Sequence, residues 1–189
     1  MSATPQVEIR RLDAMCGAPK LSSQVEVTMG ECVRLVPMSE AEFGTYEQAT
    51  VEGYAEENVQ AGYWEAEEAL ERARQSLRQI LSQGLATPGH HFCRVEDVES
   101  GETVGTVWWF EDRAGKVPRA YVYYIVVEPR RRRRGYGSAA LRAMEAEARG
   151  LGMAAVRLHV FAHNHAAIRA YERLGFHTTS LTMLKPLSS

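Results

Sequence analysis

The residues with the clearest chemical signature form a basic, glycine-containing turn at positions 129–138, with the sequence PRRRRRGYGS. The turn follows an apolar, tyrosine-rich run over residues 121–127 that predicts a buried strand, and it precedes apolar residues at helical spacing. A helix N-terminus offers unpaired N–H groups and the positive end of the helix dipole, and glycine lets the backbone approach a ligand closely. Arginine adds charge-assisted hydrogen bonds to phosphate oxygens. The turn therefore predicts a site for an anion, and a diphosphate suits it best.

The spacing within this turn differs from the common nucleotide-binding loops. It contains neither Gly-x-x-x-x-Gly-Lys-Ser/Thr nor the three glycines of Gly-x-Gly-x-x-Gly, and shows Arg132-x-x-Gly135-x-Gly137 instead. Taken alone, the five consecutive arginines at 130–134 are also compatible with an exposed basic turn that serves solubility, localisation or contact with nucleic acid.

A second motif follows an alternating, strand-like run over residues 156–161. It has the pattern Asn164-x-x-Ala-x-x-x-Tyr171-x-x-x-Gly175-Phe176. Its apolar residues and Tyr171 share one helical face, and Gly175 can end the helix in a left-handed conformation. The pattern predicts a helix that presents Asn164 at its start and Tyr171 near its end.

The two motifs, in this order, resemble the signatures of the GNAT superfamily of N-acetyltransferases, over roughly residues 31–187. The resemblance implies an α/β sandwich: a mixed, mainly antiparallel sheet of about six to seven strands with helices on both faces. It also implies that central strands splay apart around pantetheine, and that acetyl-CoA is the acyl donor, with no metal ion. Residues 62–65, 84–88 and 158–164 resemble small bacterial acetyltransferases in particular.

The resemblance also implies the site residues. The residues expected to bind the cofactor in and around the turn are Val127, Arg132, Arg133, Arg134, Gly135, Tyr136, Gly137 and Ser138. Asn164 is expected to bind pantetheine or the helix start, and a plain N-cap would explain it equally. Tyr171 is the expected general acid for the departing thiolate, since a phenol has a free pKa of about 10; its alternative role is packing, with the hydroxyl only touching the cofactor.

The sequence offers no clear general base. Related enzymes often carry a carboxylate on the strand before the turn, but residues 123–127 are YYIVV, and the first acid, Glu128, lies too near the turn. The remaining candidates, each with a structural role as its alternative, are Glu52, Glu56, Glu57 and His163. A chain of water molecules, or an amine that arrives neutral, would need no dedicated base.

Charge is distributed unevenly along the chain. Residues 31–112 contain 17 Asp and Glu against 5 Arg, whereas residues 113–189 contain 14 Lys and Arg against 4 Glu. A basic half suits a polyanionic cofactor, and an acidic half suits a cationic acceptor. We therefore expect a small-molecule or peptide primary amine as the acceptor. The residues expected to bind it are Glu52, Glu56, Glu57 and Trp64.

Length and composition fit one domain. A chain of 189 residues can bury a substantial core, and we expect residues 1–30 to form a flexible tail and residues 31–189 to form the domain. The expected strands are residues 32–36, 91–97, 103–111, 121–127, 156–161 and 176–185. Helices are expected to begin at Ser39, to span residues 65–83, and to follow the basic turn and Asn164.

Location and partners follow from the same composition. No apolar run approaches bilayer length and no signal-peptide core is present, so we expect a cytoplasmic protein without a membrane partner. Three cysteines fit a reduced compartment, and 19 Arg against 3 Lys is typical of a GC-rich bacterial genome. A homodimer is left open.

The preferred function is acetyl transfer to a primary amine by direct attack in a ternary complex. One alternative is a non-catalytic acyl-CoA-binding or sensor domain of the same fold, for which the absent strand carboxylate is the main support. The other is a nucleic-acid-binding module that uses Arg130–Arg134; it is disfavoured because basic residues concentrate in one turn instead of on several elements.

Overall fold

The computed structural model describes residues 32–183, 185 and 187, so the expected tail at residues 1–30 lies outside the described part. Five strands form one sheet in the order β1-β2-β3-β4-β5. Their bounds are β1 Val33–Pro37, β2 His90–Asp97, β3 Thr103–Asp112, β4 Arg119–Val127 and β5 Ala155–Leu158. The first three pairs are antiparallel, and β4 pairs with β5 in parallel. The predicted mixed, mainly antiparallel α/β sheet is confirmed.

The prediction of six to seven strands is wrong for the described residues. Positions 176–183 and 185 form no strand, although the sequence predicted a last strand there. A strand exists only where its backbone groups pair with a neighbour, and this segment lies along no other strand of the described chain. Local pattern therefore predicted the extended conformation but not the pairing.

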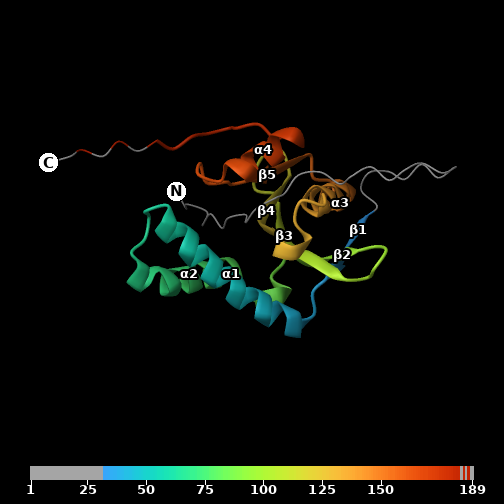
Figure 1. Cartoon of the computed structure of the whole chain (residues 1–189), viewed down its shortest axis with the longest axis horizontal. Helices are drawn as coiled ribbons and strands as arrows, with labels where there is room; N and C mark the ends of the chain where they lie inside the picture. Colours follow the sequence, from blue (N-terminus) through green and yellow to red (C-terminus); the bar gives the residue numbers. More distant parts are fainter. Residues whose placement is uncertain (1–31, 184, 186, 188–189) are drawn as a thin grey trace.

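Helices cover both faces of the sheet (Figure 1). The helices are α1 Glu40–Gln60, α2 Ala66–Ile80, α3 Tyr136–Gly150 and α4 His165–Arg173, with short 3₁₀ turns η1 Gly84–Ala86 and η2 Pro129–Arg131. The predicted capping box starts α1: the Ser39 N–H donates to Glu42 Oε2 over 2.8 Å, and the Ser39 hydroxyl accepts from the Glu42 N–H. None of the described helices is long and apolar enough to cross a bilayer.

The two faces of the sheet differ in composition. Between the sheet and α3 and α4, the buried core is mostly aliphatic and includes Val107, Ile125 and Leu141. Between the sheet and α1 and α2, the buried residues are largely aromatic. Those aromatic residues include Phe43, Tyr46, Tyr54, Phe92, Trp108, Tyr121, Tyr123 and Tyr124. Aromatic rings with polar ends suit a face that contacts a partly polar ligand.

The pairing of β4 with its neighbours has two irregularities. Opposite β3, Trp108 pairs with Tyr124 and Trp109 with Val122, so Tyr123 is the extra residue of a β-bulge. Opposite β5, pairing ends at Val122 and Leu158, although β4 continues to Val127. The end of the pairing agrees with the strand divergence that the family resemblance implied.

Candidate active site

The turn between β4 and α3 has the backbone geometry typical of an anion-binding turn. Gly135 is the N-cap residue of α3, has a left-handed backbone (φ 83°), and no side chain caps the helix. Two residues earlier, Arg133 also has a positive φ of 59°, which no other non-glycine residue of the described chain adopts. Alternating left-handed residues make successive N–H groups converge, and a helix N-terminus adds its dipole. The residues present therefore fit the diphosphate of acetyl-CoA.

The arginines of the turn are not equivalent. Arg131 forms an ion pair with Glu102, and Arg132 folds back so that its Nε donates to the Val127 carbonyl over 3.1 Å. These two side chains stabilise the turn itself. Arg133 and Arg134 are exposed and can reach phosphate oxygens. The sequence predicted Arg132, Arg133 and Arg134 alike as cofactor-binding residues; the structure separates Arg132, which shapes the turn, from Arg133 and Arg134, which remain at the surface.

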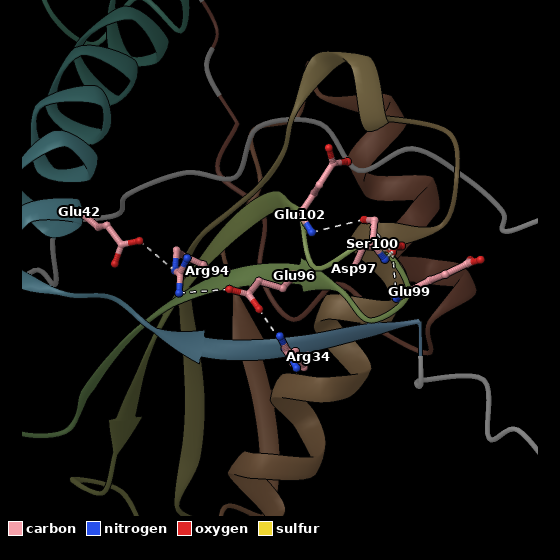
Figure 2. Close-up of polar contacts among 8 residues, drawn as sticks. All are labelled: Arg34, Glu42, Arg94, Glu96, Asp97, Glu99, Ser100 and Glu102. Atoms are coloured by element: carbon pink, nitrogen blue, oxygen red, sulfur yellow. Dashed lines mark hydrogen bonds and ion pairs between the residues drawn. The ribbon is translucent and has the colours of Figure 1, made fainter.

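The turn between β2 and β3 contacts the start of α3, and sequence reasoning missed this contact. Asp97 Oδ1 accepts hydrogen bonds from the backbone and hydroxyl of Ser100 (2.8 and 3.1 Å), which orders the turn (Figure 2). Asp97 Oδ2 accepts a 2.7 Å hydrogen bond from the hydroxyl of Tyr136, the first residue of α3. The Asp-x-x-Ser-Gly sequence signals the turn, but not its contact with α3.

The pKa values of this contact agree with its geometry. Hydrogen bonds from the Ser100 backbone and from Tyr136 lower the pKa of Asp97. Burial, followed by the hydrogen bond to the Asp97 carboxylate, raises the pKa of Tyr136 to about 12. Near neutral pH the pair is therefore a phenol that donates to a carboxylate, which is a charge-assisted hydrogen bond.

A chain of ion pairs ties the first helix to the edge of the same hairpin. Arg94 on β2 contacts Glu42, the capping residue of α1 (3.0 Å), and Glu96 (3.1 Å), which also contacts Arg34 on β1 at 2.9 Å (Figure 2). Glu96 is only 6% exposed. The start of α1 is thereby attached to the two strands beneath it.

The second motif adopts the predicted local structure. Asn164 caps α4, since its side-chain oxygen accepts from the Ala167 N–H over 3.2 Å. Tyr171 is 2% exposed and lies in the aliphatic core, with its ring 5.6 Å from that of Phe176. Gly175 has a φ of 92° just past the helix, in agreement with the expected left-handed end. Asn164 therefore acts as the N-cap of α4, one of the two roles expected from the sequence; this role is compatible with a contact to pantetheine.

The structure does not bring the three expected acceptor glutamates together. Glu52 and Glu56 are exposed and line a hollow of about 440 Å³ between α1 and α2, whereas Glu57 is only 8% exposed. Successive helical residues are rotated by about 100°, so Glu56 and Glu57 point to different sides. Of the three, only Glu57 lies on a buried side of α1.

Trp64 lies where the loop between α1 and α2 meets the aromatic face. Its ring is 5.1 Å from that of Tyr54 in an edge-to-face arrangement. The neighbouring Tyr63 lies 6.0 Å from Phe161, which follows β5. This loop therefore contacts the segment that leaves the sheet where β4 and β5 stop pairing.

Two histidines lie on that departing segment. His163, a base candidate from the sequence, is exposed and stacks on Phe161 at 5.5 Å. His159, which sequence reasoning did not single out, is half-buried, and its Nδ1 has no hydrogen-bond partner among the described residues. Burial and then the nearby Arg157 lower the pKa of His159, so its imidazole is neutral at neutral pH. The alternating, strand-like sequence of residues 156–161 was the available signal.

The aromatic face beside these residues stays uncharged. Burial raises the pKa of Tyr121 and of Tyr123 to about 12 each. Burial, followed by His91, lowers the pKa of His90 to about 4, and Trp108 Nε1 donates to His90 Nδ1 over 3.0 Å. No group of three or more His, Cys, Asp or Glu side chains placed to hold a metal occurs in the described part.

Comparison with known proteins assigns the architecture. Residues 51–176 match the model of the Acetyltransferase (GNAT) family. The chain is 36% identical over 155 residues to the uncharacterised N-acetyltransferase YycN of Bacillus subtilis (strain 168), covering 82% of this chain and 99% of that protein. It is 30% identical over 153 residues to YdgE, another uncharacterised N-acetyltransferase of that strain, covering 81% and 97%. The crystal structure of YycN superposes with a TM-score of 0.78 over 83% of this chain and 99% of that one.

Proposed function

Because the chain belongs to the GNAT family and is an N-acetyltransferase, we propose that it transfers the acetyl group of acetyl-CoA directly to a primary amine in a ternary complex. Enzymes of this family use acetyl-CoA and act on small-molecule or peptide acceptors. The observation that carries the proposal for this chain is the uncapped N-terminus of α3 beside the left-handed Arg133 and Gly135. Such a site holds the diphosphate and fixes the position of the thioester relative to the amine.

The thioester would extend from this turn toward the end of β4–β5 pairing. Past Val122 and Leu158 the backbone of β4 lacks β5 as a partner, so its polar groups there are open to a ligand. A ligand that pairs with this backbone is oriented along the strand. The Arg132–Val127 hydrogen bond supports the end of β4 at which this pairing would begin.

Tyr171 is the proposed general acid. Attack of the amine expels a thiolate, which leaves faster if a proton reaches its sulfur. Two observations support this role: Tyr171 occupies the tyrosine position of the Asn164-x-x-Ala-x-x-x-Tyr171 signature, and packing holds its ring in a buried, fixed position.

The attacking nitrogen must lose a proton before or during transfer. Glu52 and Glu56 are exposed between α1 and α2, which makes them poor candidates. His159 is neutral at neutral pH and follows the last β5 residue that pairs with β4, so it is the better-placed acceptor of that proton, directly or through water. A half-buried neutral imidazole costs less to protonate transiently than a fully buried one.

A cationic amine is the proposed acceptor. Glu57 supplies a carboxylate on a buried side of α1, and the Tyr54–Trp64 pair supplies aromatic rings on the same helix and its following loop. A carboxylate with aromatic rings attracts an ammonium ion and also contacts the hydrocarbon next to it. The acidic balance of residues 31–112 adds long-range attraction.

Release of free CoA is the direct test. Purified protein is incubated with acetyl-CoA and panels of polyamines, amino acids, amino sugars, arylalkylamines and peptides, and thiol release is followed together with acetylated product by mass spectrometry. We expect turnover with a cationic amine and none with anionic acceptors. Tight binding of acetyl-CoA without turnover across all panels would indicate the sensor alternative.

A further inference from the structure

Arg157 places a cation on the face of the sheet that carries the proposed acceptor end. Its neighbours in β5, Val156 and Leu158, pack against the aliphatic core between the sheet and α3 and α4. Because side chains alternate along a strand, Arg157 projects to the opposite, aromatic face. There it lies directly across from Tyr121 in the pairing of β4 with β5. The guanidinium is therefore on the same side of the sheet as α1 and α2.

The groups beside Arg157 belong to the proposed acceptor end and are uncharged. Burial raises the pKa of Tyr121 to about 12, and the nearby charge of Arg157 opposes this rise. Burial and then the charge of Arg157 lower the pKa of His159, two residues further along the chain. Near neutral pH, Tyr121 is therefore a phenol and His159 a neutral imidazole. Arg157 is the charged group where the pairing of β4 with β5 ends at Leu158.

Arg157 has no carboxylate partner among the described residues. The arginines of β1 and β2 do have one: Arg34 and Arg94 contact Glu96 over 2.9 and 3.1 Å. Arg157, in contrast, is exposed on an edge strand, and none of the ion pairs within the described part includes it. A guanidinium presents N–H donors in a fork that matches the two oxygens of a carboxylate. The charge of Arg157 is thus available to an anionic group of a ligand.

A positive charge at this place disfavours an acceptor that carries positive charge alone. Like charges repel each other, and charges closer than about 8 Å are not fully screened at physiological salt. The carboxylate of Glu57 and the acidic balance of residues 31–112 nevertheless favour an ammonium ion at the same end. A ligand with both an ammonium and a carboxylate satisfies both sets of charges, whereas a phosphate would bring a second negative charge towards the acidic residues.

We propose that Arg157 binds a carboxylate of the acceptor, and that the acceptor is an amino acid with a basic side chain, as the acidic half of the domain requires. This inference rests on the proposed acetyl transfer and leaves its chemistry unchanged: the N–C bond forms, the C–S bond of the thioester breaks, the nitrogen loses one proton and the sulfur gains one. Arg157 precedes by one residue the point at which β5 stops pairing with β4, and one strand residue advances about 3.3 Å. A carboxylate on Arg157 therefore lies only a few bonds from a nitrogen that attacks a thioester at this point. Arg157 selects and orients the acceptor and takes no part in proton transfer.

Matched pairs of acceptors test the requirement for a carboxylate. Each pair is an amino acid and the amine that lacks only its carboxylate: lysine and cadaverine, ornithine and putrescine, arginine and agmatine. The amide of each amino acid keeps the size of the carboxylate and removes its charge. For the best pair we expect kcat/KM to be about 10- to 100-fold higher for the amino acid than for its amine or amide, as one charge-assisted contact provides. Equal values, or activity confined to amines without a carboxylate, would overturn this inference and leave the proposed function standing, whereas no turnover with any amine would overturn both.

Variants of Arg157 test the residue itself. Arg157→Gln should reduce the preference to about twofold or less, mainly through a higher KM for the amino acid, and Arg157→Lys should retain part of it because the cation remains. Both members of a pair meet the same His159, so their ratio is insensitive to any change in the pKa of His159. The matched control is Arg78→Gln, which changes an exposed arginine in the last turn of α2 and should keep the full preference. Acetyl-CoA affinity by calorimetry should be equal in all three variants and the unmodified chain. An Arg157→Gln enzyme that keeps the full preference would overturn the assignment.

Discussion

The proposed donor end and the proposed acceptor end of this site are built in different ways. The donor end is a single turn, in which Arg133, Gly135 and the start of α3 are near neighbours in sequence. The acceptor end combines α1, the loop at Trp64, β4 and the segment that follows β5. A diphosphate is one fixed chemical group, so one short motif can hold it, whereas an amine's remaining parts must be enclosed from several sides. In the proposed site, donor recognition therefore depends on a local motif, whereas acceptor recognition depends on how distant elements pack.

Tyr171→Phe should have the largest effect. It should lower the rate of acetyl transfer without weakening the binding of acetyl-CoA or of the acceptor. Loss of the phenol proton should lower kcat by about 10- to 10⁴-fold, with the dissociation constant for acetyl-CoA almost unchanged. Phenylalanine keeps the buried ring in the aliphatic core, so the fold should persist. Rates are measured under single-turnover conditions, and binding by calorimetry. Unchanged chemistry would reduce Tyr171 to a packing residue.

Gly137→Val should weaken binding of acetyl-CoA at the turn before α3. Gly137 is buried in the first turn of α3, and a branched side chain there should block close approach of the phosphates. We expect acetyl-CoA to bind about 100-fold more weakly by calorimetry, with helical content retained by circular dichroism. The control is Arg130→Ala, an exposed change outside the Arg132-x-x-Gly-x-Gly motif that should cost less than about threefold. Equal losses in the two variants would contradict this account of the turn.

Glu57→Gln should weaken binding of the acceptor and leave binding of acetyl-CoA unchanged. Loss of a buried carboxylate that attracts an ammonium ion should raise the acceptor KM about tenfold and reduce the salt dependence of kcat/KM, while acetyl-CoA affinity stays the same. The matched control, Glu56→Gln, changes the neighbouring exposed carboxylate in the same helix and should alter KM less than about twofold. Identical behaviour of the two variants would show that α1 contributes only surface charge.

The Asp97–Tyr136 contact attaches the β2–β3 turn to the start of α3, so the proposed donor end also depends on one contact between distant segments. Asp97→Asn and Tyr136→Phe should each weaken acetyl-CoA binding about fivefold, as expected for a charge-assisted hydrogen bond that positions a loop. The double variant should lose little more than either single variant, because both remove the same 2.7 Å hydrogen bond. Additive losses in calorimetry would show that the two residues act separately.

His90 gives the smallest effect, a pH dependence of stability on the acceptor face. Its pKa is lowered to about 4 by burial, whereas an unfolded histidine titrates near 6.5. Between these values the unfolded chain binds more protons, so stability should fall as pH decreases from about 6.5 to 4. His90→Gln should flatten this part of the Tm profile relative to the unmodified chain. A profile of unchanged slope would mean that His90 is not neutral in the folded protein.

Many helices and strands of the fold could be predicted from local sequence patterns. The turn signal at residues 99–102 between two strand-like runs, the capping box at Ser39 and the left-handed Gly175 predicted elements that the structure contains. The last strand was predicted wrongly, because residues 176–183 have strand composition but no neighbour in the described chain. Composition determines what a segment can become, and pairing determines whether it does.

The sequence by itself determined the turn before α3 and the helix that starts at Asn164, because both depend on residues close together in the chain: Gly135 at the start of α3, and Asn164 capping Ala167. Only the tertiary structure decided that Glu57 points inward while Glu56 points outward, since that depends on how α1 is rotated against the sheet. It also decided that Asp97 supports α3, and that His159 lies where β4 and β5 part. The local structure of a short motif can be predicted from the spacing of its residues, whereas contacts between distant segments depend on the packing of the whole chain.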